Sequence, residues 1–178
     1  MQERAEQLIL VDSQDREIGT VNKREAHSHP LLHRAFSVFL IHDNTILLQK
    51  RAEGKYHSAG LWANSCCSHP RVGEELLASA EKRLLEELGM TCPLREIGSF
   101  VYLHRFSDEM YEYEYDHVLV GDYFGAFHPD LDEIAELRWV SAADLSAELL
   151  REPGRFAPWF LTAAPMVLRH LFVKQSDS

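Results

Sequence analysis

The chain has 178 residues, with 18 Lys and Arg against 28 Asp and Glu, so its formal net charge is −10. This acidic balance argues against a nucleic acid or an anionic membrane held by general electrostatics, although it is compatible with a small anion in a local basic pocket. The length predicts a single domain over residues 1–178. The hydrophobic fraction of 46% is ordinary for a globular protein and disfavours disorder.

The cysteines and the lack of a targeting pattern favour the cytoplasm. Cys66, Cys67 and Cys92 are an odd number, and an ordinary disulfide between neighbours is sterically poor, so a reducing compartment is expected. The opening segment MQERAEQLIL has no basic stretch followed by a long apolar run, which a secretory signal would have. No apolar run approaches the ~20 residues of a membrane span. We therefore expect a soluble cytoplasmic protein without a membrane partner.

The N-terminal half predicts a hairpin, two strands and a long loop. Apolar residues 8–11 and 18–21 flank a polar run at 12–16, which indicates an opening hairpin. A His-rich loop at 27–33 follows, then a buried strand at 35–41, a turn at 43–44 and a strand at 46–49. Residues 51–74 are rich in Gly, Ser, Cys and His and are predicted as a loop. A loop of this length inside a domain is usually functional.

The C-terminal half predicts three helices among further strands. Apolar residues at helical spacing predict a helix over 76–88, with Glu74 and Glu75 in its N-terminal turn and Gly89 at its C-terminal cap. Strands are expected at 97–103, 111–124 and 137–140. Ser141 suits the cap of a second helix, and a last helix is expected from Pro158 toward residue 172. The order of elements favours an α+β or mixed α/β sandwich.

Three histidines and two glutamates form a candidate metal site. Glu112 and Glu114 share one face of a predicted strand because side chains alternate with a period of two. Together with His27, His33 and His69 they offer ligand types that suit zinc, manganese, iron or magnesium. Taken alone, same-face glutamates are more often solvated side chains. Other histidines also compete for these roles: His29, His57, His104 and His117.

The polar loop and the following helix carry further candidates. A thiol near His69 can act as a nucleophile, a base or a metal ligand, or it can be a small buried hydrophobe. Arg83 and Glu87 are spaced i, i+4, which suits either a surface ion pair or a metal-binding carboxylate beside a phosphate-binding guanidinium. Basic residues that could hold a small polyanion gather at Lys23-Arg24, Lys50-Arg51 and Lys55. Tyr102 and Trp159 are core or rim residues by default.

Four segments, taken in order, resemble one known family over nearly the whole chain. They are His33-Arg-Ala-Phe-Ser37, Gly60-Leu-Trp-Ala-Asn-Ser-Cys-Cys-Ser-His-Pro70, Glu86-Glu-Leu-Gly89 and Glu112-Tyr-Glu114. With these segments the chain resembles the type I isopentenyl diphosphate isomerases of the Nudix superfamily. The resemblance implies a Nudix-like α/β/α sandwich with a mixed sheet, an N-terminal hairpin and a C-terminal helix. It also implies metal-dependent isomerisation of isopentenyl to dimethylallyl diphosphate, a step of isoprenoid biosynthesis.

The signature segment of the Nudix superfamily is only partly present. Glu86, Glu87 and the earlier Glu74 fill its acidic positions before Gly89. Ser68 stands at its opening glycine position, and Lys82-Arg83 replaces the usual Arg-Glu pair. The missing glutamate argues against the alternative of a Nudix-type diphosphate hydrolase, and Arg83 puts a cation where a diphosphate can be held.

The resemblance assigns a role to each candidate residue. The residues that match a site for Mn²⁺, Zn²⁺ or Mg²⁺ are His27, His33, His69, Glu112 and Glu114, with His29 as the competitor of His27. Glu87 and the backbone carbonyl of Cys67 match a second site, for Mg²⁺ bound with the substrate diphosphate. The residues that match the substrate-binding groups are Lys23, Arg51, Lys55, Ser68 and Arg83 around the diphosphate and Trp159 at the hydrocarbon end. Cys67 and Glu114 match the catalytic pair, with Tyr102 as the partner of the glutamate.

Three functions are thus weighed: the isomerase, the Nudix-type hydrolase, and a metal-binding or regulatory module that uses only the His/Glu cluster. The expected partner is a small prenyl diphosphate, with no nucleic acid, and the expected assembly is a monomer or a homodimer. Two questions stay open from the residues. One is the identity of the metal in the His/Glu site, and the other is which of Cys67 and Glu114 protonates the substrate first.

Overall fold

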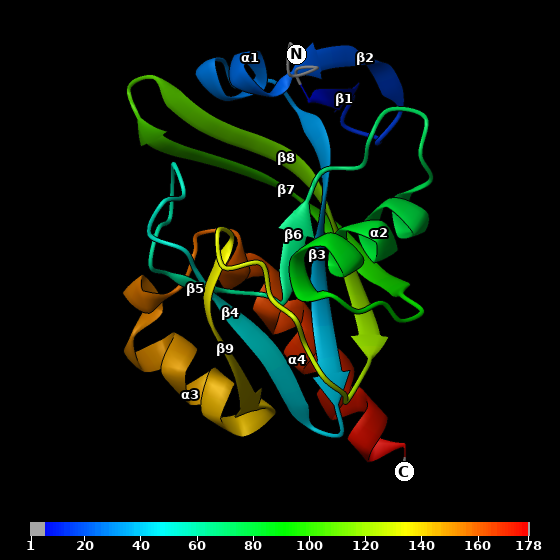
Figure 1. Cartoon of the computed structure of the whole chain (residues 1–178), viewed down its shortest axis with the longest axis vertical. Coiled ribbons are helices and arrows are strands. Elements are labelled where there is room, and N and C mark those ends of the chain that lie inside the picture. Colours follow the sequence, from blue (N-terminus) through cyan, green and yellow to red (C-terminus); the bar gives the residue numbers. More distant parts are fainter. Residues whose placement is uncertain (1–5, 178) are drawn as a thin grey trace.

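The computed structural model describes residues 6–177, so the first five residues of the opening segment and of the expected domain lie outside the described part, as does residue 178. Its strands are β1 Gln7–Val11, β2 Glu17–Asn22, β3 His33–His42, β4 Thr45–Arg51, β5 Trp62–Ala63, β6 Cys66–Ser68, β7 Arg95–Ser107, β8 Met110–Asp122 and β9 Ile134–Ser141. Its helices are α1 Lys23–Ser28, α2 Leu76–Leu88, α3 Ala142–Arg151 and α4 Phe160–Ser176, with a short 3-10 turn at Pro153–Arg155 (Figure 1).

The strands form one mixed sheet organised around β3. This strand runs parallel to β8 and antiparallel to β1, β4 and β6. Beyond β8 lies the antiparallel partner β7, and beyond β4 lie β5 and β9. The sheet splits where β7 and β8 extend toward α1 while β4 and β9 diverge from them (Figure 1). The predicted mixed sheet and N-terminal hairpin are therefore confirmed.

Helices cover the sheet on both faces. Alternate residues of β3 enter two different cores: Val38 and Leu40 join a core with α2, whereas Phe39 and Ile41 join a core with α3 and α4. Because both faces are covered, β3 reads as a nearly unbroken buried run from His33 to Ile41. This arrangement confirms the predicted sandwich.

The ends of two helices follow from the capping residues that the sequence offers. Gly89 closes α2 in the left-handed conformation, with φ of 66°, and its backbone N–H donates to the carbonyl of Leu85. The Ser141 side chain accepts from the N–H of Asp144 at the start of α3. Both caps are as predicted. Within residues 6–177, no helix has the length and apolarity needed to cross a bilayer.

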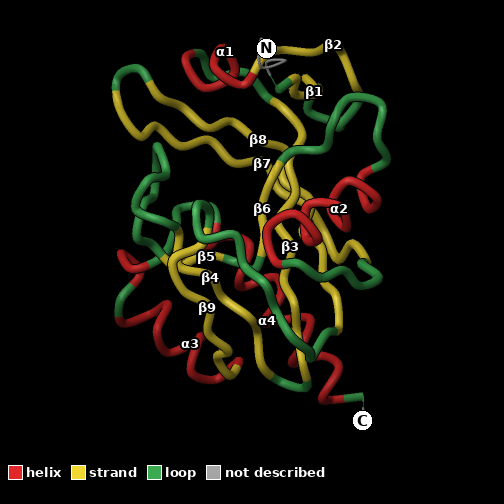
Figure 2. The backbone as a smooth tube through the Cα atoms, viewed as in Figure 1, coloured by secondary structure: helices red, strands yellow, loops and turns green. Residues whose placement is uncertain are grey.

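Three local predictions are wrong. Residues 23–28, of which the last two were assigned to a His-rich loop, form α1, whose N-cap Asn22 accepts from the N–H of Glu25 at 2.9 Å. Six residues are too few for a visible apolar period. The segment 51–74 contains the short strands β5 and β6, although most of it is loop (Figure 2). The last helix begins at Phe160, two residues later than expected, and contains Pro165.

Candidate active site

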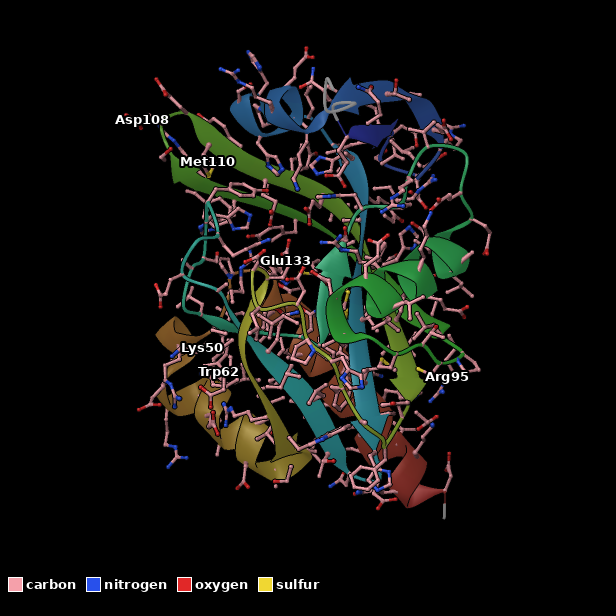
Figure 3. All side chains as sticks on the ribbon, viewed as in Figure 1. Lys50, Trp62, Arg95, Asp108, Met110 and Glu133 are labelled. Carbon is pink, nitrogen blue, oxygen red and sulfur yellow. The ribbon has the colours of Figure 1, made fainter. Side chains whose placement is uncertain are left out.

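Most of the predicted site residues line one cavity of about 90 Å³; His27, His33 and Tyr102 do not line it. Segments far apart in the sequence reach it: α1, the ends of β3 and β4, the loop before β5, β6, α2, β8, the turn before β9 and the start of α4. Figure 3 labels one of its lining residues, Glu133, on that turn. The lining residues are Lys23, Phe36, Ser37, Gln49, Arg51, Lys55, Tyr56, His57, Cys67, Ser68, His69, Arg83, Glu87, Glu112, Glu114, Asp116, Glu133 and Trp159.

Three imidazoles meet beside this cavity, and His69 is the one of the three that lines it. The ligand atoms of His27, His33 and His69 all lie within 4.8 Å of one another. His27 Nδ1 lies 3.0 Å from the carbonyl of Tyr111, and His33 Nδ1 lies 2.8 Å from that of Leu31. A carbonyl only accepts, so both Nδ1 atoms carry a proton, and Nε2 is the atom that each ring can offer to a metal when it is neutral. His29 is exposed and outside this cluster, so the structure favours His27 over it.

Two carboxylates of β8 line the cavity together with His69. The strand alternates as predicted, so Glu112 and Glu114 are buried on one face while Tyr113 between them points the other way. The parallel register pairs His33 with Glu114, whose Oε1 lies 3.1 Å from His69 Nε2 and 3.6 Å from His33 Nε2. Burial raises the pKa of Glu114, but the two imidazoles outweigh burial and the pKa is lowered. Burial and the charge of Glu114 raise the pKa of Glu112.

This donor set fits a divalent metal ion. His33 Nε2 and Glu112 Oε1 are buried and find no hydrogen-bond partner in the described part of the chain. Unpaired buried polar atoms are costly, and two of them beside further imidazole and carboxylate atoms are what a bound cation would satisfy. Burial also lowers the pKa of His27 and His69, which keeps their rings neutral, as metal binding requires.

The adjacent cysteines point to opposite faces of β6. Cys66 belongs to the core with α2, and its thiol donates to Glu87 Oε2 at 2.7 Å. Cys67, paired with Ser37 of β3, faces the cavity, where its Sγ lies 4.0 Å from an Arg51 nitrogen. Burial raises the pKa of Cys67 to about 12, although the Arg51 charge acts in the opposite direction. Cys67 is therefore a neutral thiol at physiological pH.

Three of the four predicted anion-binding cations, Lys23, Lys55 and Arg83, already pair with carboxylates. Arg83 contacts Glu87 at 3.2 Å and Glu133 at 3.6 Å, and Lys55 forms a short ion pair with Glu133. Glu87 is only 4% exposed, so the pair with Arg83 is not the surface ion pair that the spacing alone allowed. Lys23 also lines the cavity and pairs with Glu6 at 3.4 Å. An incoming anion would thus compete with Glu133 for Lys55 and Arg83.

Aromatic side chains complete the site. Trp159 is 3% exposed, its indole N–H donates to Asn64 Oδ1 at 3.0 Å, and the Arg51 guanidinium lies 5.0 Å from its ring. Tyr102 stands opposite Glu114 in the β7–β8 ladder, which places both side chains on one face. Among the described atoms, its buried hydroxyl has no partner, and Tyr102 is not one of the cavity-lining residues given above.

The structure adds residues to which no role was assigned from the sequence, His57 having been named only as a competing histidine. Tyr56, His57 and Glu133 lie in the cavity wall but come from segments without regular periodicity. Asp116 continues the alternation of Glu112 and Glu114, a signal that was visible, and it accepts from the Ser37 hydroxyl at 2.8 Å. Burial and the charge of Glu114 raise the pKa of Asp116 well above its usual range.

The fold is similar to solved structures of low sequence identity. A Deinococcus radiodurans protein matches with a TM-score of 0.68 at 18% identity, over 83% of this chain and 90% of its own. A MutT protein from Methanosarcina mazei matches with a TM-score of 0.63 at 16% identity, over 81% of this chain and 95% of its own. At these identities the likeness concerns the fold alone.

Sequence relatives give the family. The model of the NUDIX domain matches residues 31–160. A Photorhabdus laumondii protein named isopentenyl-diphosphate Delta-isomerase 2 is 47% identical over 86% of this chain and 87% of its own. A Burkholderia multivorans protein named isopentenyl-diphosphate Delta-isomerase is 46% identical over 87% of this chain and 89% of its own. A Photobacterium profundum protein of the same name is 43% identical over 97% of both chains. The chain therefore belongs to the Nudix family and, within it, to the isopentenyl-diphosphate Delta-isomerases.

Proposed function

We propose that the chain isomerises isopentenyl diphosphate to dimethylallyl diphosphate. The observation that carries the proposal is that Cys67 and Glu114, from different strands, line one cavity together with Lys and Arg side chains and with His69, a member of the imidazole cluster. The names of the relatives support the same reaction. The replacement of the Nudix Arg-Glu pair by Lys82-Arg83 argues against diphosphate hydrolysis, because Arg83 supplies a cation where hydrolases place a carboxylate.

The reaction needs an acid and a base on opposite ends of an allyl unit. One proton is added to the terminal alkene carbon and another is removed two carbons away. An unactivated alkene is a weak base, so the proton donor must be held in place in a pocket that excludes water. Cys67 supplies a thiol and Glu114 a carboxylate, and Tyr102 is the proposed hydrogen-bonding partner of the carboxylate. In the reverse direction the two groups exchange roles.

The proposed first metal, Mn²⁺, Zn²⁺ or Mg²⁺, is held by His27, His33, His69, Glu112 and Glu114. When bound, it would fix the Glu114 carboxylate and tune its acidity. A second metal, Mg²⁺, would be held by Glu87 and the backbone carbonyl of Cys67 and would neutralise charge on the substrate diphosphate. The buried Glu87 carboxylate, which lies next to Cys66 of β6, supports this second site.

The substrate is proposed to lie with its diphosphate among the cations and its hydrocarbon end against Trp159. The proposed diphosphate ligands are Lys23, Arg51, Lys55, Ser68 and Arg83, all of which line the cavity. Anchoring the charged end provides binding energy that holds the small reactive end between acid and base. The π face of Trp159 is suited to stabilise the positive charge that protonation places on the tertiary carbon.

We further propose that residues 1–178 act as one catalytic domain in the cytoplasm, as a monomer or a homodimer. The continuous sheet supports the single domain, and the free thiols of Cys66, Cys67 and Cys92 support a reducing compartment. Sedimentation of the purified protein distinguishes the two assemblies.

The test follows the products. The protein, loaded with Mn²⁺ and Mg²⁺, is incubated with isopentenyl diphosphate and the mixture is separated. Dimethylallyl diphosphate is the expected product, and cleavage of the diphosphate without isomerisation would contradict the proposal. The variants Cys67→Ala and Glu114→Gln are each expected to lower the rate by about 10²–10⁴-fold, the usual effect of losing a general acid or base. Cys92→Ala, a buried cysteine away from the cavity, is the control and is expected to retain the rate.

A further inference from the structure

His57 is a buried histidine in the cavity wall for which the assigned roles leave no task. It lies in the loop between β4 and β5 and is 8% exposed. Its Nε2 lies 3.1 Å from Glu112 Oε2. This places an imidazole from an irregular loop directly on one of the two carboxylates of the proposed metal site.

The tautomer of His57 follows from its two neighbours. A carboxylate oxygen only accepts, so Nε2 carries the proton and donates to Glu112. The other ring nitrogen, Nδ1, lies 3.2 Å from the hydroxyl of Ser58, which is able to donate to it. In this arrangement Nε2 donates to Glu112 while Nδ1 accepts from Ser58.

The contact leaves Glu112 with one occupied and one available oxygen. Oε2 faces His57, whereas Oε1 is buried and meets no hydrogen-bond partner within residues 6–177. A carboxylate with a single free oxygen at a cluster of imidazoles is oriented for one-point binding of a cation. Interactions of this kind, behind the ligands themselves, commonly fix the direction of a metal-binding carboxylate.

The His57 ring is itself held in place from several sides. It stacks on Phe106 with 4.3 Å between ring centroids and 21° between planes. It meets Trp159 edge to face at 5.8 Å and Tyr56 edge to face at 4.6 Å. Its backbone carbonyl accepts from Arg51 at 3.3 Å. A donor with so little freedom can direct the carboxylate at a small entropic cost.

We propose that His57 is a positioning residue that aims Glu112 Oε1 at the metal and links this ligand to Trp159, the wall for the substrate's hydrocarbon end. The inference rests on the metal site of the proposed function. His57 acts through Glu112: its Nε2 lies 3.1 Å from that carboxylate, and His57 does not belong to the group of imidazoles whose ligand atoms gather within 4.8 Å, which comprises His27, His33 and His69.

Direct Mn²⁺ binding tests the role without any need for turnover. Free Mn²⁺ is counted by electron paramagnetic resonance during titration of the wild type and three variants. His57→Phe keeps the flat ring and loses the donor, whereas His57→Gln keeps an N–H near the same place. His42→Phe is the matched control, because His42 also stacks on a phenylalanine, Phe124 at 4.2 Å, but lies outside the cavity.

His57→Phe is expected to bind Mn²⁺ 10–100-fold more weakly than the wild type, the usual effect of losing a partner behind a metal ligand. His57→Gln is expected to stay within about threefold of the wild type, and His42→Phe to match it. Equal affinity in the wild type and His57→Phe would overturn the role of His57 alone, as would a His57→Gln as weak as His57→Phe. A wild type without Mn²⁺ affinity would overturn the metal site as well. Circular dichroism verifies that each variant folds. If His57→Phe does not fold, the Mn²⁺ affinities of His57→Gln and His57→Ala are compared instead, and equal affinities would overturn the role of His57.

Discussion

The ionisation of Cys67 is open to a direct chemical measurement. Burial raises its pKa to about 12 from an ordinary value of 9.0. At pH 8 roughly one molecule in 10⁴ would then carry the thiolate, against about one in ten for an ordinary thiol, a deficit of about 10³. A more basic thiolate is the better nucleophile, by about 16–32-fold over this interval. Alkylation by iodoacetamide should therefore be about 30–60-fold slower than that of glutathione, before any steric protection.

Peptide-resolved mass spectrometry of the metal-free protein gives the rate for Cys67 separately from Cys66 and Cys92. Steric protection alone lowers the rate at every pH, whereas a raised pKa makes the rate climb tenfold per pH unit to beyond pH 10. In Arg51→Met the cation beside the thiol is lost, so the climb is expected to continue to still higher pH. A Cys67 rate equal to that of glutathione at pH 8, with a plateau below pH 10, would refute the neutral thiol.

Three further predictions concern stability. Trp159→Phe removes the hydrogen-bond donor to the buried Asn64 Oδ1 and should lower the free energy of unfolding by about 1–3 kcal/mol. Each kcal/mol corresponds to a fall in Tm of about 2–4 °C, so an unchanged Tm in calorimetry would contradict the prediction. Because the pKa of Asp116 is raised in the folded state, stability should decline as the pH rises above 3.8, where the unfolded carboxyl ionises. Asp116→Asn should remove that decline and stabilise the protein by about 1–3 kcal/mol at pH 7, and urea titrations that show a less stable variant would argue against it. Chelation of the metal should lower Tm, because an ion at 100 times its Kd adds about 2.7 kcal/mol to the free energy of unfolding. A Tm that changes neither with EDTA nor with added Mn²⁺ would speak against the site.

The sequence was most informative where side chains follow a regular period. The alternation along β8 predicted that Glu112 and Glu114 share a face, and the structure agrees. The helical period and the caps predicted α2, including its end at Gly89. In these elements local geometry dictates direction, so a single sequence is enough.

Prediction failed where only tertiary packing decides direction. His57 lies in a loop without a period, and its contact with Glu112 depends on how that loop folds over the sheet. Glu133 is a similar case, because its pairing with Lys55 joins segments 78 residues apart. His27 is a different case: the resemblance predicted it, and the structure brings it to His33 and His69, but the helix α1 that carries it could not be predicted because its six residues give no periodic signal.

The site depends on the parity of residue numbers along β6 and β8. On β8 the even-numbered positions 112, 114 and 116 are the buried acids, and on β6 the odd-numbered Cys67 faces the cavity while Cys66 faces α2. One residue inserted or deleted within either strand would exchange the two faces, since the period is two. It would bring tyrosines to the cluster, or Cys66 to the cavity. We therefore expect length changes here to be tolerated only in pairs, whereas the loop before β5 is free of this constraint.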